Sequence, residues 1–438
     1  MDTLPLELTQ HILHQIPGTL NPPELSTTLR ACSLVSHNFK AHAQPLLFSE
    51  FIRYGHYYRL PKLYETLLLY PYLLDLLKGL WVDVRCLSGG QSDGSDLDTL
   101  LDLWISSSTS RNYYLIVDCA LEPMTPKTLT TLSRFISSTN LTVLAFSEVI
   151  EAPIWILYHC TSVRELHLCR SSFSGFDSDG VGGLMLRGNG IQSTWYRMTL
   201  DRPRLYHLYL ESADTGDTPI LKWFLHSDCA FDITALRTFH FLDISNDFDS
   251  YTLARNLVQR VSCSLEDLAL DPPTRFCEQN IYLSPEFCTF DTLPCLRRLK
   301  FSLQQEKYPQ SSLLPWVVNV LSGLAFPEFL EEVEVSCFLG DCEAEDVRRD
   351  GGWEELDLFL ASTMRRRFGE PPTRHLKKVR FGIVVPVQSE EKEKTRSREV
   401  AAILPVVLPK LWALGIATVS FSSVFGHVED ADCWYEPS

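Results

Sequence analysis

The chain has 438 residues, of which 45% are hydrophobic and 11% aromatic, so it is too apolar to be a disordered protein. Its formal net charge of −16 repels phosphate backbones, which argues against a nucleic-acid partner. The 13 cysteines are odd in number and have no regular spacing. This pattern favours buried thiols over a disulfide framework, and we expect a reducing compartment, the cytoplasm or the nucleus.

The first residues carry no basic segment followed by an apolar run, so they do not predict a secretory signal. The most membrane-like stretch is 400–419, but it contains Pro405, Pro409 and Lys410. These residues favour a buried helix followed by a strand over a membrane span. We therefore expect no membrane partner.

Three short helices are predicted in the first fifty residues. Apolar residues at four-residue spacing from Leu8 define the first helix, which Gly18 ends. Asn21-Pro22-Pro23-Glu24 is typical of a second helix start, because Asn caps, Pro suits the first turn and Glu completes a capping box. Ser36 is placed to cap a third short helix that ends near Pro45.

The arrangement resembles the F-box family, most closely the F-box-like proteins of fungi. The matching residues are Leu4-Pro5-Leu6-Glu7-Leu8, Ile12-Leu13 and the segment 29–39, LRACSLVSHNF. Ser36 and Phe39 stand where the family often has Cys and Trp. The alternative interpretation is an ordinary three-helix cap for the domain that follows.

The resemblance implies a protein partner. F-boxes dock on a Skp-type adaptor, which links them to a cullin scaffold and a ubiquitin-conjugating enzyme. Docking of this kind buries apolar side chains between helices. The positions carried over as adaptor contacts are Leu4, Pro5, Leu8, Ile12, Leu34 and Val35.

The rest of the chain repeats one six-residue pattern: apolar, two variable residues, apolar, one variable residue, apolar. The clearest copies start at Leu141, Val163, Leu205, Leu236, Leu265, Leu296, Leu330, Leu376 and Ile416, with Leu77 fitting too and Tyr113 a looser match. This is the strand signature of leucine-rich repeats, at longer and less regular spacing. Alternation at the end of each copy predicts a short strand with one buried face.

Amphipathic segments between the copies predict helices at 125–137, 250–261, 313–322 and 353–367. Because a strand–helix unit cannot bury its apolar face alone, neighbouring units must stack. We therefore expect an α/β fold in which the three-helix F-box-like module is followed by an irregular leucine-rich-repeat-type strand–helix solenoid, curved, with the strands lining the concave side. A doubly wound α/β domain is the alternative, but it would show longer apolar strands without a common register.

The expected domains are the module at 1–50, the solenoid at 51–426 and an acidic tail at 427–438. Polar composition predicts a loop at 88–98, and glycines predict a loop insertion at 171–190. The segment 388–399, QSEEKEKTRSRE, is interpreted as a charged, mobile insertion between the last two strands.

Chemistry-bearing motifs are incomplete throughout. His11 and His14 lie three residues apart without a third metal ligand nearby, and Cys337 and Cys342 lack a second cysteine pair. No GxSxG, HExxH or kinase signature is present. We expect neither an enzyme nor a cofactor or metal site, with an enzyme on a repeat-like α/β frame as the remote alternative.

The predicted function is that of a non-catalytic substrate receptor of a Skp–cullin–F-box-type ubiquitin ligase. The alternative is an F-box scaffold without a ligase role. The client would contact the third and fifth residues of each pattern, which face away from the core. The predicted client contacts are His167, His207, Tyr209, His240, Arg298, Lys300, Glu332, Glu334, Lys378 and Arg380. Basic, acidic and basic strands follow one another at the end, which would favour a client with matched charge blocks. The alternative interpretation is a solvated strip without a partner.

Overall fold

The computed structural model describes residues 22–36, 39–44, 60–76, 79–83, 101–105, 113–118, 126–138, 140–174, 202–211, 218–242, 248–271, 293–304, 313–324, 329–338, 352–365, 376–387 and 390–425, with residues 11, 13, 46, 99, 124 and 348. The chain forms two compact units, Met1–Pro203 and Arg204–Ser438, called unit 1 and unit 2. The boundary falls inside the segment expected to be one repeat array. Both units are built from parallel strands and helices, so the expected α/β class is confirmed.

Helical segments near the N-terminus pack around one apolar cluster. Helix α2 spans Pro22–Val35, and residues 39–44 are also helical. Leu13, Leu29, Phe39 and Ala43 are buried together. The backbone N–H of Phe39 donates to the Ser36 hydroxyl at 3.3 Å, so Ser36 caps the third helical segment as predicted.

Among the described residues, unit 1 continues with four parallel strands paired in the order β1-β2-β3-β5. Strands β4 and β6 pair separately. The elements are α4 (Leu60–Leu69), η3 (Pro71–Leu76), β1 (Gly79–Asp83), β2 (Tyr113–Asp118), α7 (Pro126–Ser138), β3 (Leu141–Ser147), β4 (Ala152–Pro153), η4 (Ile154–His159), β5 (Glu165–Cys169) and β6 (Phe173–Ser174).

In the described part of unit 2, seven parallel strands follow the chain in their order in the sheet, from β7 to β13. The elements are β7 (His207–Glu211), α9 (Thr218–Leu225), β8 (Thr238–Leu242), α10 (Phe248–Arg260), β9 (Asp267–Leu270), β10 (Arg298–Gln304), α12 (Leu314–Gly323), β11 (Glu332–Phe338), α14 (Gly352–Arg365), β12 (Lys378–Val387), α15 (Glu390–Val407), α16 (Pro409–Ala413) and β13 (Ala417–Phe425).

Every copy of the six-residue pattern coincides with a strand. From Leu141 to Leu376, the first, fourth and sixth residues of each copy are buried, as Leu236, Phe239 and Phe241 illustrate for β8. The four predicted helices are present as α7, α10, α12 and α14, each within two residues of the expected bounds. The alternation therefore located both the strands and their buried face.

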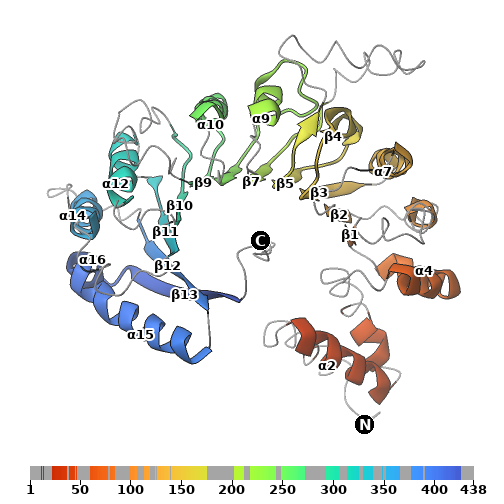
Figure 1. The fold of residues 1–438 in the computed structure, drawn as a ribbon, viewed down its shortest axis with the longest axis horizontal. Coiled ribbons are helices and arrows are strands. Elements are labelled where there is room, and N and C mark those ends of the chain that lie inside the picture. Colours follow the sequence, from red (N-terminus) through yellow and green to blue (C-terminus); the bar gives the residue numbers. More distant parts are fainter. Residues whose placement is uncertain are drawn as a thin grey trace. The chain divides into compact units, whose positions relative to one another are not determined.

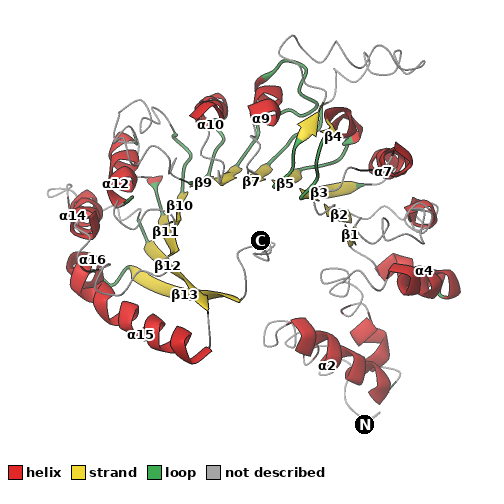
Figure 2. Cartoon of the chain, in the orientation of Figure 1, coloured by secondary structure: helices red, strands yellow, loops and turns green. Residues whose placement is uncertain are grey.

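The helices of unit 2 lie along one face of its sheet (Figure 1). No helix in the described part of unit 2 lies against the opposite face (Figure 2). Large rings fill the layer between helices and strands: Trp316 of α12 meets Phe301 of β10 at 5.4 Å between centroids, and Trp353 of α14 meets Phe381 of β12 at 5.8 Å. Aromatic contacts of this geometry add to the free energy of burial.

The interpretation of 388–399 as a loop between the last two strands is wrong for 390–399, which form the first part of α15. Glu, Lys and Arg are strong helix formers, and Glu390 and Lys394 have the four-residue spacing that supports a helix. Val400, Leu404 and Leu408 are buried and follow the helix period, which anchors this helical stretch on the sheet. High charge alone is therefore no sign of a loop.

The stretch 400–419 forms the end of α15, α16 and the start of β13, as expected from its prolines. Among the described residues, no helix is both long and apolar enough to cross a membrane. The expected loop at 88–98 and the tail at 427–438 lie outside the described residues, as does the predicted insertion beyond residue 174.

Candidate interaction surfaces

An exposed apolar pair ends helix α2. Leu34 exposes 87% of its surface and Val35 exposes 44%, while Leu29 on the same helix is fully buried in the N-terminal cluster. Because Leu34 and Val35 lie outside the core, they are available to a partner. The other four predicted adaptor contacts, Leu4, Pro5, Leu8 and Ile12, lie outside the described residues.

A second apolar surface in unit 1 was missed by the sequence reasoning. Leu68, Leu69, Tyr70 and Tyr72, at the junction of α4 and η3, expose between 49% and 72% of their surfaces. The rings of Tyr70 and Tyr72 meet edge-on at 6.3 Å. The signal was the unbroken apolar run LLLYPYLL, which exceeds what a single helix can bury on one face.

The side chains opposite the helices of unit 2 form a band that we call the polar strip. Its members occupy the third and fifth positions of the pattern and come from β7 to β12: His207, Tyr209, Thr238, His240, Asp267, Arg298, Lys300, Glu332, Glu334, Lys378 and Arg380. Parallel register places them in two rows, because Arg298 pairs with Glu332 and Lys300 pairs with Glu334, while each glutamate pairs onward with β12.

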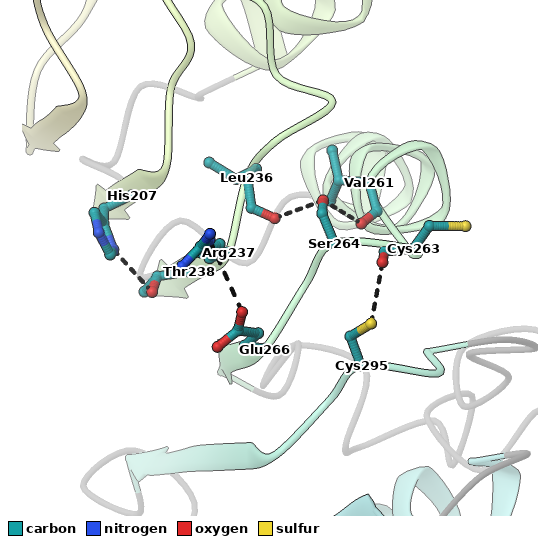
Figure 3. A network of polar contacts seen from close by, with 9 residues as sticks. All are labelled: His207, Leu236, Arg237, Thr238, Val261, Cys263, Ser264, Glu266 and Cys295. Atoms are coloured by element: carbon teal, nitrogen blue, oxygen red, sulfur yellow. Dashed lines mark hydrogen bonds and ion pairs between the residues drawn. The ribbon is translucent and has the colours of Figure 1, made fainter.

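Histidine and aromatic side chains occupy the β7–β8 end of the polar strip. His207 and Thr238 point toward one another, with Nδ1 and Oγ1 at 2.9 Å (Figure 3). The Tyr209 and His240 rings meet edge-on at 4.7 Å. His240 Nε2 lies 3.4 Å from Asp267 Oδ1. Cross-strand pairs of this kind hold the rings in fixed orientations.

Ion pairs connect the β9–β12 part of the polar strip. Arg298 Nε lies 3.0 Å from Asp267 Oδ2, and Lys300 Nζ lies 3.0 Å from Glu334 Oε1. Arg380 pairs with Glu332. Each acidic strand thus interacts with basic side chains on a neighbouring strand, a preference known for cross-strand pairs. The basic and acidic strands, which were expected to contact a client of matched charge, therefore form ion pairs with one another.

A further row of contacts joins the residues just before the strands. Arg237 lies 3.8 Å from Glu266 (Figure 3), and Glu331 pairs with both Arg297 and Lys377. The Ser264 hydroxyl donates to the Leu236 carbonyl at 2.8 Å (Figure 3). A single exposed ion pair contributes little to stability. These contacts join neighbouring strands at the residues that precede each strand.

Of the predicted client contacts, only His167 belongs to unit 1. It is buried, and its Nε2 lies 2.8 Å from Glu165 Oε1 on the same strand. Little of this imidazole is available to a partner. The nine other predicted contacts all lie on the polar strip of unit 2, where each is at least partly exposed.

One hydroxyl–imidazole pair in unit 1 resembles part of a hydrolase site. Ser137 Oγ lies 2.8 Å from His159 Nδ1, and burial lowers the pKa of His159. The same hydroxyl donates to the Ser133 carbonyl, and the Trp155 ring packs edge-on against the imidazole. Burial also raises the pKa of the neighbouring Cys160 thiol, which disfavours the reactive thiolate. The pair connects α7 to η4.

No protein-family model matches the chain, and no curated protein matches it either. The candidate interaction surfaces are therefore the exposed pair at the end of α2 and the polar strip, both identified from the structure.

Proposed function

We propose that the protein is a non-catalytic substrate receptor of a Skp–cullin–F-box-type ubiquitin ligase. In this proposal the N-terminal helices are an F-box module that docks on a Skp-type adaptor, and through it on a cullin. The strand–helix units stack as a leucine-rich-repeat-type solenoid that holds a client protein. Tethering the client raises its effective concentration at the transfer machinery.

The observation that carries the proposal is the exposed Leu34–Val35 pair at the end of α2. A helical cluster that buries Leu29, Phe39 and Ala43 yet leaves a leucine 87% exposed is suited to bind another protein. The same pair is one of the contacts that the F-box resemblance implies. Phe39, which stands where the family often has Trp, is buried in the cluster core and does not belong to the exposed pair.

The test is adaptor binding by a double variant, Leu34→Ala with Val35→Ala. Both side chains are exposed, so the fold should tolerate the change, whereas loss of interface anchors should weaken adaptor binding by at least about tenfold. Lys40→Ala, an exposed residue of the third helical segment, is the matched control and should bind as wild type.

Binding would be measured by calorimetry with a purified Skp-type adaptor, and folding by circular dichroism. Wild-type affinity in the folded double variant would refute docking through α2. If the wild-type chain itself does not bind the adaptor, the ligase role fails.

A further inference from the structure

The paired charges of the polar strip are unequally exposed. The side-chain exposed fractions are 59% for Arg298, 41% for Lys300 and 45% for Arg380, against 16% for Asp267, 26% for Glu334 and 21% for Glu332. The acidic side chains are thus more buried than the basic side chains with which they pair. A ligand that approaches this face meets positive charge first.

The charges on β10–β12 are also unequal in number. Arg298 and Lys300 on β10 and Lys378 and Arg380 on β12 flank the two acids Glu332 and Glu334 on β11. Lys378 belongs to no ion pair among the residues that the structure describes. On the β13 side, Arg380 has the uncharged Thr418 as its register partner. When Asp267 of β9, the partner of Arg298, is counted as well, four basic side chains adjoin three acidic ones, so this face carries a small positive surplus in a protein whose total charge is −16.

The distance between the basic side chains of β10 and those of β12 defines the geometry of a matching ligand. Strands β10 and β12 are two strand spacings apart, or about 10 Å. An extended peptide in the polyproline II conformation advances about 3.1 Å per residue with three residues per turn, so acidic residues three positions apart lie on one face and span about the same distance. The carboxylates of such a peptide would reach both basic rows while it crosses the strands.

We infer that the polar strip binds an acidic peptide segment in the polyproline II conformation, with acidic residues about three positions apart. The inference rests on the proposed function, in that this segment would belong to the client. Electrostatic complementarity of this kind steers binding and sets specificity. The acidic remainder of the protein repels such a segment, so attraction is local to β10–β12. Tyr209 and His240, on the same face, offer an aromatic anchor beyond the basic rows.

The test measures binding of labelled peptides to the full chain by fluorescence anisotropy. One peptide carries Glu at every third position in a Gly/Ser background, and its counterpart carries Gln at those positions. Lys378→Gln should weaken binding of the Glu peptide by about three- to fivefold at low salt, and added salt should reduce the difference. Glu334→Gln should strengthen binding by a similar factor, because Lys300 then has no carboxylate partner on β11.

Lys222→Gln on α9 is the matched control, since it removes the same charge from an exposed position on the helix side and should leave binding unchanged. Equal binding of the Glu and Gln peptides, or no response to both strip variants, would overturn the inference. A single-stranded oligonucleotide that binds as tightly as the Glu peptide would overturn the assignment to a peptide.

Adaptor binding is measured on the same samples, which separates the two proposals. Loss of the peptide response with adaptor binding intact rejects the acidic segment alone. A peptide response in a chain that does not bind the adaptor rejects the ligase role and leaves the chemistry of the strip standing.

Discussion

At the scale of single residues, Asp357 shows how one buried carboxylate joins two elements. It lies on α14, is 1% exposed, and accepts hydrogen bonds from the backbone N–H groups of Lys410 at 3.1 Å and Leu411 at 2.8 Å. These donors belong to the first turn of α16, where N–H groups have no partner within the helix. The carboxylate satisfies them and favours the positive end of the helix dipole.

Asp357→Ala should lower the free energy of unfolding by about 2–3 kcal/mol, because it leaves buried backbone donors without an acceptor. Asp357→Asn, which keeps one carbonyl acceptor, should cost less. Chemical denaturation would measure both, with the exposed Glu355→Ala on the same helix as control. Equal stability of the Ala variant and wild type would show that the contact adds nothing net.

At the scale of elements, the residue that follows a helix can determine where the helix ends. Helix α16 stops at Gly415, whose φ of +67° lies in the left-handed region, and the Gly415 N–H donates to the Trp412 carbonyl at 3.0 Å. The chain then enters β13. Glycine adopts this conformation without the cost that a Cβ imposes, which is why it commonly ends helices.

Gly415→Ala should therefore cost about 1 kcal/mol of unfolding free energy, since a Cβ at this position meets open space and only the backbone conformation is strained. Gly415→Asn is the matched comparison and should cost less, because Asn tolerates positive φ. Thermal and denaturant unfolding would rank the three proteins. A Gly415→Asn variant that is less stable than the Gly415→Ala variant would contradict this explanation.

At the scale of the whole molecule, the strands of unit 2 depend on their neighbours. Strand β12 covers the edge of β11 along its whole length, and Phe381 packs against Trp353 of α14. Leu404, Leu408 and Leu411 are fully buried in the same region. Each of these strands therefore receives hydrogen bonds and apolar cover from the strand and helix next to it.

Deleting everything after Pro371 should therefore expose the edge of β11 and the apolar face of α14. We expect the truncated chain to aggregate, because an uncovered strand edge pairs with other chains. Light scattering and a thermal melt would measure this, with the full chain as control. A soluble product with one sharp transition would indicate that the C-terminal part is a separate domain.

The six-residue pattern was enough to predict the strands of the parallel sheets, although not β4 and β6, and the amphipathic segments predicted four of the helices between strands, because these features depend on local periodicity. Read across the strands, the same pattern also indicated which charges adjoin, as Lys300 and Glu334 do. The segment 390–399 was misread because its charge was weighed and its helix propensity was not. The tertiary structure alone revealed that Asp357 meets α16 and that the acidic side chains of the polar strip are more buried than the basic ones. Burial and contacts between residues far apart in the chain depend on how strands and helices pack against one another, which no local pattern specifies.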